Sequence, residues 1–155
     1  MTVPATVASI REHVRQAVLL ALADAGCTAV PTLADLSDYS DATSYPLAKA
    51  WWDNGPEAME RYMGGNGIAT AQMSVAVVPW CDDSDFEEKC SGIVDAVRPY
   101  VGAAHVRSCM DASMAGNLVD IVANAQSQPT GVSSPYGESI FSLAVRYRTT
   151  DEVMP

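Results

Sequence analysis

Two stretches of the chain alternate between apolar and polar side chains, and this pattern constrains the fold more than any other feature. They run from Ala69 to Val78 and from Phe141 to Arg148. A period of two over such lengths predicts strands with one buried face. The predicted buried faces are Ala69, Ala71, Met73, Val75 and Val77 in the first strand, and Phe141, Leu143, Val145 and Tyr147 in the second.

The N-terminal segment predicts a helix that starts at Pro4 or Thr6 and ends at Ala25. Its apolar residues fall on a single helical face, and Gly26 stands where a left-handed C-terminal cap belongs. The residues of this face are Ile10, Val14, Ala17, Val18, Ala21, Leu22 and Ala25.

A second helix is predicted after Pro79. Ser84 and Glu87 form a capping box, and Asp82, Asp83 and Asp85 complement the helix dipole. Pro99 predicts a frayed or kinked last turn. The buried stripe would be Phe86, Cys90, Ile93, Val94, Val97 and Val101. We expect Ile10, Val14, Val18 and Leu22 of the first helix to pack with Phe86, Ile93, Val94 and Val97 against the sheet.

The remaining segments carry weaker signals. Asn54-Gly55-Pro56 opens a predicted short helix, because proline suits the first helical turn. Val106, Ser108 and Met110 alternate as a strand would. Together these signals predict a strand at Tyr45–Trp52, a helix at Pro56–Met63, a strand at His105–Asp111, either a strand or a short helix at Ala115–Ala123, a polar loop at Asn124–Gly137 and a polar tail from Thr149 to Pro155. We therefore expect residues 1–155 to form one α/β (α+β) domain: a single mixed, mainly antiparallel sheet with two main helices packed on it.

The composition is that of a globular chain, with 48% hydrophobic and 18% charged residues and a net charge of −10. Without a basic stripe, tight binding to nucleic acid through its phosphates is not expected. The acidity has two interpretations: it keeps the protein soluble, or it repels DNA that slides past. No stretch approaches the length of a membrane span.

The chemistry-bearing residues form no catalytic or metal-binding motif. Cys27, Cys81, Cys90 and Cys109 include no CxxC pair, which predicts four reduced and mostly buried thiols rather than a zinc site. His13 is expected on the solvated side of the first helix, and His105 is interpreted as a structural histidine rather than a general base. We expect no catalytic residue, no cofactor and no bound metal.

The arginines of the second half are the candidate contact residues. Arg146 and Arg148 share one face of the last strand because they are two positions apart. Either they lie on a solvated sheet face opposite cross-strand acids, or they pair with acids of a neighbouring subunit. The candidate subunit-interface residues are Arg146, Arg148, Arg107, Asp82, Asp83 and Asp85.

Three segments, in their order along the chain, resemble the tail terminator proteins of long-tailed, siphovirus-like bacteriophages. They are Gln72–Pro79, the acidic opening Asp85–Glu88 of the helix that runs to Tyr100, and Ser142–Tyr147. The likeness is one of pattern and order over most of the chain. It implies an insertion around residues 45–67, within a domain that has one sheet with helices packed on it.

The resemblance also implies a function. Terminator subunits form a ring, expected here to be a hexamer, that ends tail-tube polymerisation and presents a surface to the head or neck. The expected partners are copies of the chain, the tail tube protein and a head-completion or neck protein. DNA would pass through the lumen without specific binding, and the ring would sit at the head-proximal end of the virion tail after assembly in the host cytoplasm. Two alternatives stay open: a head-completion (stopper) protein of the neck, and a small α/β ligand-binding or enzymatic domain.

Overall fold

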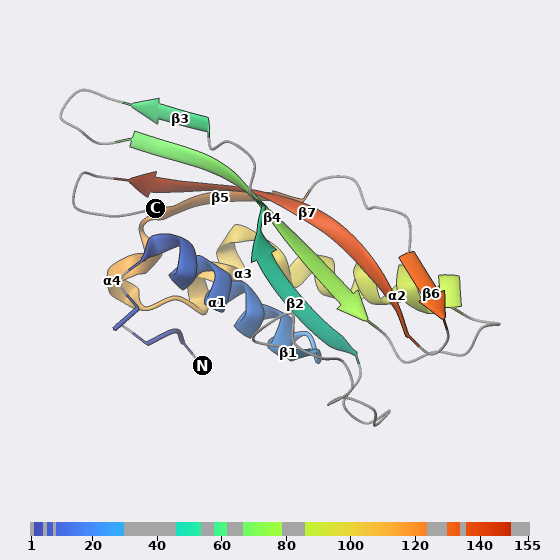
Figure 1. Cartoon of the computed structure of the whole chain (residues 1–155). Coiled ribbons are helices and arrows are strands. Elements are labelled where there is room, and N and C mark those ends of the chain that lie inside the picture. Colours follow the sequence, from blue (N-terminus) through green and yellow to red (C-terminus); the bar gives the residue numbers. More distant parts are fainter. Residues whose placement is uncertain are drawn as a thin grey trace.

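One sheet with helices packed against it makes up the fold (Figure 1). The computed structural model describes residues 2–4, 6–7, 9–29, 46–53, 58–61, 67–78, 86–123, 130–133 and 136–149. In chain order its elements are α1 (Ile10–Asp24), β1 (Thr28–Ala29), β2 (Leu47–Trp52), β3 (Ala58–Arg61), β4 (Gly67–Val78), α2 (Phe86–Val97), the 3-10 helix η3 (Arg98–Val101), α3 (Ala103–Ser108), α4 (Ala112–Ala115), β5 (Leu118–Ala123), β6 (Thr130–Ser133) and β7 (Tyr136–Thr149).

The strand order of the sheet is β1-β2-β4-β7-β5, with β3 also paired to β4 and β6 to β7. β1 and β2 run parallel, and every other pair is antiparallel. The expected fold class, a single mixed and mainly antiparallel sheet with α1 and α2 packed on it, is therefore confirmed. The two strands predicted from their alternation, β4 and β7, are the long central pair.

The predicted buried faces of β4 and β7 are correct. Met73 lies opposite Leu143 and Val75 opposite Phe141, and all four side chains belong to the core. The other face of β4 is more buried than an alternating strand requires, since Ser74, Ala76 and Val78 are buried as well. At this end, both faces of the strand are therefore shielded from solvent.

Helix α1 begins later than predicted, because Ser9 caps it and its side chain accepts a hydrogen bond from the Glu12 amide. Its end matches the prediction: Gly26 has a φ of 97°, the left-handed conformation that terminates a helix. The expectation that His13 is solvated is wrong, since the side chain is fully buried. His13 lies three residues after Ile10 and one turn before Ala17, so it falls within the apolar stripe.

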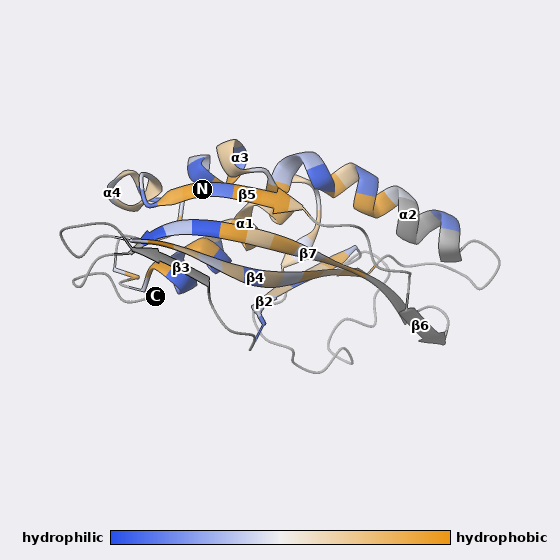
Figure 2. Ribbon diagram, turned by 90° about the horizontal axis from the view of Figure 1, so that it is seen from above, coloured by the Kyte–Doolittle hydropathy of each residue, from blue (hydrophilic) through white to orange (hydrophobic). Residues whose placement is uncertain are grey.

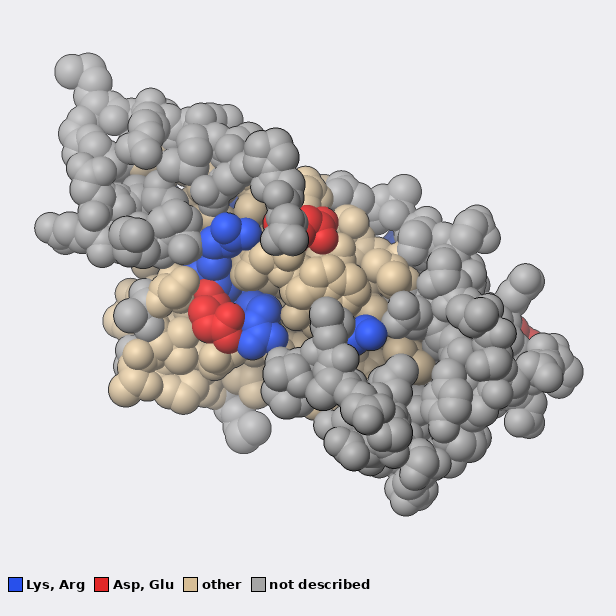
Figure 3. Space-filling view, viewed as in Figure 1, with Lys and Arg blue, Asp and Glu red and all other residues tan. Residues whose placement is uncertain are grey.

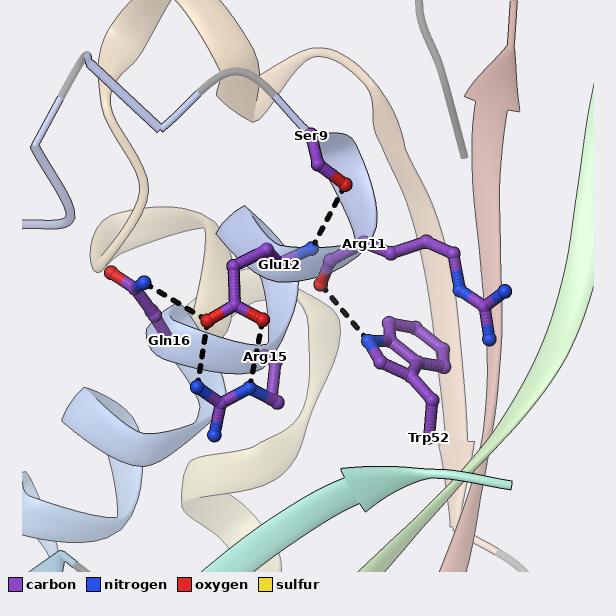
Figure 4. Close-up of polar contacts among 6 residues, drawn as sticks. All are labelled: Ser9, Arg11, Glu12, Arg15, Gln16 and Trp52. Atoms are coloured by element: carbon purple, nitrogen blue, oxygen red, sulfur yellow. Dashed lines mark hydrogen bonds and ion pairs between the residues drawn. The ribbon is translucent and has the colours of Figure 1, made fainter. Parts of the chain in front are cut away.

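The aromatic ring of Trp52 fixes α1 to the sheet (Figure 4). Its indole nitrogen donates a hydrogen bond to the Arg11 carbonyl oxygen over 3.1 Å, and the Arg11 guanidinium lies 4.7 Å from the ring centroid. The ring also meets Tyr147 edge to face, at 6.1 Å between centroids. One side chain of β2 thus contacts α1 and β7 together.

Helix α2 continues into η3, which contains Pro99, so the predicted irregular last turn is a change to 3-10 geometry. Val94, Val97 and Val101 are buried as predicted, and Ile93 packs partly buried against the same core. Figure 2 shows α2 and α3 along one side of the β4–β7 pair. Ile10, Val14, Val18 and Leu22 of α1 lie in that core too, so the predicted packing of the two helices is correct for the residues whose side chains are described.

Three of the weaker predictions are wrong. The predicted helix at Pro56–Met63 contains strand β3, which pairs with β4. The predicted strand at His105–Asp111 contains helix α3, because Val106 and Met110 are buried one helical turn apart. The predicted loop at Asn124–Gly137 contains strand β6 and the start of β7.

Two other predictions have clear outcomes in the structure. The segment that allowed either a strand or a helix forms strand β5, and β2 matches its predicted strand closely. The capping-box residue Ser84, the acids Asp82, Asp83 and Asp85, and the tail after Thr149 lie outside the described residues.

Candidate functional site

Asp24, His105 and Cys109 form the one group of metal-ligating side chains found in the part of the chain that the structure describes. The Nε2 atom of His105 lies 2.9 Å from Oδ2 of Asp24, and the Cys109 thiol donates a hydrogen bond of 3.6 Å to the same oxygen. The three ligand atoms lie within 4.8 Å of one another. A carboxylate, an imidazole and a thiol therefore converge on one point.

Two helix ends bring the three residues together. Asp24 is the last residue of α1, and Cys109 caps the C-terminus of α3. His105 stands four positions before Cys109, so the two side chains occupy one face of α3 a turn apart. The His105 and Tyr100 rings pack in a T-shaped arrangement, with their centroids 5.1 Å apart. Asp24 is exposed, His105 half-buried and Cys109 buried.

The charge state of this group argues against nucleophilic catalysis. The hydrogen bond from His105 holds the pKa of the Asp24 carboxyl below its ordinary value, with a smaller contribution from the Cys109 thiol. Burial, reinforced by the neighbouring Asp24 carboxylate, raises the pKa of Cys109. A catalytic cysteine needs a depressed pKa and a directly adjacent base, whereas here the carboxylate lies between thiol and imidazole. The arrangement suits either a hydrogen-bonded contact that joins α1 to α3 or a set of metal ligands.

Arg107 faces away from this group. Its Nε donates to the Leu118 carbonyl oxygen at 3.0 Å, and its Nη2 donates to the Val119 carbonyl oxygen. The guanidinium therefore fastens α3 to the start of β5. Arg107 therefore has a structural role within the subunit, whether or not it also contacts a neighbouring subunit.

Arg146 and Arg148 lie on the sheet face opposite the helices. Arg146 is half-buried and stands directly across from Thr70 on β4 and Asp120 on β5. Arg148 is exposed near the end of β7. One interpretation of the arginine pair is a solvated sheet face opposite cross-strand acids. For Arg146 such an acid is present, namely Asp120. Asp82, Asp83 and Asp85, the other candidate contact residues, lie outside the described part of the chain.

On the face drawn in Figure 3, basic and acidic side chains of the described residues lie beside one another, so these residues form no patch of a single charge there. On α1, Glu12 accepts hydrogen bonds from both Arg15 and Gln16 (Figure 4). The bidentate contact of Arg15 lowers the pKa of the Glu12 carboxyl and raises that of the Arg15 guanidinium.

His13 has a structural position. Its Nε2 accepts a hydrogen bond from the Asp111 amide at 3.2 Å, while its buried Nδ1 has no partner among the described residues. The side chain therefore links α1 to the start of α4. His105, the other histidine, contacts Asp24 instead.

The Asp24–His105–Cys109 group is not among the sites predicted from the sequence. One signal could have found part of it: His and Cys four apart form a ligand pair on a helix. The alternation of the segment hides this signal because it indicates a strand, in which residues four apart lie about 13 Å from each other. Asp24 reaches the group only through the packing of α1 against α3.

No protein-family model matches the chain, and no curated protein matches it significantly. Among the helices that the structure describes, none is long and apolar enough to cross a bilayer.

Proposed function

We propose that this chain is a structural subunit of a bacteriophage tail: a terminator that caps the tail tube as a ring and offers an attachment surface to the head or neck. The fold supports the proposal, because the resemblance implies a mixed α/β domain of one sheet with helices packed on it, and α1 and α2 pack on one sheet here. The ring would carry no catalysis of its own and would sit at the head-proximal end of the tail.

The proposal rests on the outer face of strands β5 and β7, which exposes an apolar side chain to solvent. Val122, the exposed large hydrophobic residue of the described surface, is 51% exposed there and lies directly across from Ala144. Ser142, Ala144 and Arg146 of β7 are half-buried on the same face. This face therefore combines one exposed valine with small side chains and the two arginines, and we propose that another subunit packs on it.

The edge of the sheet is a second possible contact. In the described sheet β5 is the outermost strand on its side, and an outermost strand can pair with another chain. Arg107 already occupies the carbonyl groups of Leu118 and Val119, so only the later part of β5 remains for such pairing. Of the two proposed contacts, the sheet face therefore offers more residues to a neighbouring subunit than the edge of β5 does.

Charge supplies the remaining argument for a ring. The chain has nine lysines and arginines against nineteen acids, so identical subunits repel one another unless bases lie at the contacts. A ring requires two complementary patches on each subunit. The patch with Arg146 and Arg148 provides one, and acids of the next subunit, of which Asp82, Asp83 and Asp85 are the candidates, provide the other. Such charge pairs would determine how neighbouring subunits align and how fast they associate more than how tightly they bind.

The test is the mass of the purified chain in solution, alone and with the tail tube protein from the same source, by native mass spectrometry. A terminator should form a closed ring, expected to be a hexamer, and should be seen by electron microscopy at one end of assembled tubes. A chain that stays monomeric and leaves tube ends bare contradicts the proposal. Binding to portal or adaptor instead of tube would assign it to the stopper class.

A further inference from the structure

We propose that Asp24, His105 and Cys109 form a binding site for a divalent transition metal, with Zn²⁺ the ion that fits best. The proposal does not depend on the ring. It revises the expectation of a metal-free chain, which rested on linear spacing and could not include a residue from α1.

Two of the three ligand separations are close to those around a tetrahedral ion. Zinc bonds of about 2.0–2.3 Å to oxygen, nitrogen and sulfur place neighbouring ligand atoms roughly 3.3–3.8 Å apart. The Asp24–Cys109 separation of 3.6 Å falls in this range, and the His105–Asp24 separation of 2.9 Å would widen by a few tenths of an ångström. The third pair, His105 and Cys109, lies within 4.8 Å, so binding would also require the half-buried His105 ring to move by up to about 1 Å toward the thiol.

The donor set selects the class of ion. A thiolate and an imidazole favour zinc and its neighbours in the first transition series, whereas magnesium and calcium prefer oxygen ligands. On binding, the Cys109 thiol releases its proton to solvent and its sulfur forms a bond to the metal. The ionised Asp24 and Cys109 together neutralise the two charges of the ion, and His105 binds as a neutral ring through Nε2.

The environment leaves one side of the site open. Cys109 is 2% exposed, while the side chains of His105 and Asp24 are 33% and 50% exposed. Three protein ligands with a solvent-facing fourth position would leave room for water or for a donor from another molecule. The edge contact with Tyr100 restricts the orientation of the His105 ring. A bound ion would also join the C-terminus of α1 to α3.

Cobalt is the direct probe, because a thiolate bound to Co²⁺ gives a charge-transfer band in the near ultraviolet. Reduced, metal-free protein should bind one equivalent of Co²⁺ with this band, and Zn²⁺ should displace it. Cys109→Ser should abolish the band, and His105→Gln should weaken binding at least about tenfold. The matched control is Cys27→Ser, which alters another buried thiol outside the group and should keep the band.

Thermal melting with and without Zn²⁺ provides a second readout, because an ion that binds only the folded chain raises its melting temperature. Zinc should stabilise the wild type and Cys27→Ser but not His105→Gln, whose folding is checked by circular dichroism. The proposal is overturned if the wild type gives no band, if Cys109→Ser keeps it, or if zinc stabilises His105→Gln as much as the wild type. The three residues would then form a hydrogen-bonded contact only.

Discussion

His105 and Arg107 stand two positions apart on α3 and hold that short helix to two different neighbours. His105 contacts Asp24 at the end of α1, whereas the Arg107 guanidinium donates to carbonyl groups at the start of β5. Side chains two apart on a helix point in different directions, which allows one six-residue helix to join two elements. α3 therefore connects the helical layer to the outermost strand of the described sheet.

The first prediction concerns Arg107. Arg107→Gln should lower the free energy of unfolding by about 1–2 kcal/mol, because it removes charged donors from two carbonyl groups. Arg107→Lys should recover little of this, since an ammonium group lacks the planar fork that reaches both oxygens. Urea unfolding measures the change. Arg98→Gln, at an exposed position of η3, is the control and should stay close to wild type; equal losses in both variants would contradict the assignment.

The glycines Gly26 and Gly116 give a second, paired prediction. At both positions the space that a Cβ atom would occupy has no other group within 4 Å, but Gly26 has a φ of 97° and Gly116 a φ of −66°. Gly26→Ala should destabilise the protein by about 1–2 kcal/mol through backbone strain alone. Gly116→Ala should be neutral or stabilise by about 0.4–1 kcal/mol. Melting temperatures that move in the same direction for both variants would contradict this.

The third prediction tests the packing of the helices on the sheet. Leu22 and Val94 are fully buried in the common core. Leu22→Ala should cost about 2–5 kcal/mol, and Leu22→Asp or Val94→Asp should prevent folding. Ala23→Ser, at the exposed neighbouring position, is the control. A soluble Leu22→Asp variant that melts cooperatively would exclude the assigned face of α1.

How much of the fold the sequence predicts depends on the length of each pattern. β4 and β7 are recognisable because their alternation continues for many residues, and α1 and α2 because their apolar stripes run for several turns. The segment at Pro56–Met63 is too short for either period to decide, and its pairing with β4 is a tertiary interaction. β6 is similarly fixed by pairing with β7 rather than by its own composition.

The candidate site shows the same limit more sharply. Val106, Ser108 and Met110 alternate as a strand does, yet Val106 and Met110 also lie one helical turn apart, and burial against α1 decides for the helix. Only in that helix do His105 and Cys109 share a face. Asp24 joins them from 81 positions before His105 in the sequence, a contact that local spacing cannot show.

The pair Glu12 and Arg15 gives a pH-dependent prediction. The Glu12 pKa is lowered in the folded protein, so the carboxylate stabilises the fold above its ordinary pKa and this contribution disappears as the pH falls through the folded value. Glu12→Gln should therefore lower stability by a constant amount at neutral pH, and the difference from wild type should shrink below about pH 4.5. Denaturation at several pH values measures it. Arg15→Gln should cause a similar loss, and the double variant should lose less than the sum; additive losses would show that the pair is not coupled.

The last prediction concerns the proposed ring contact at Arg146 and Arg148. Arg148 is exposed, so Arg148→Glu should leave the monomer folded while it weakens ring assembly. Arg146→Glu would place an acid directly across from Asp120, so it should also lower the stability of the subunit by about 0.2–1 kcal/mol. The double variant should be unable to assemble or to cap tails at normal length.

Arg98→Glu is the matched control for these reversals, because it makes the same change in net charge at an exposed position of η3, which is not part of the β5–β7 face. If repulsion from extra negative charge were the whole effect, all three single variants would weaken assembly equally, and lowering the ionic strength would enlarge that shared loss. If Arg148 meets an acid of the next subunit, its reversal should reduce the ring fraction far more than that of Arg98 at the same salt concentration. Native mass spectrometry gives the ring fraction and electron microscopy the tail length. Rings and tails of normal size from the double variant would exclude this face as the contact.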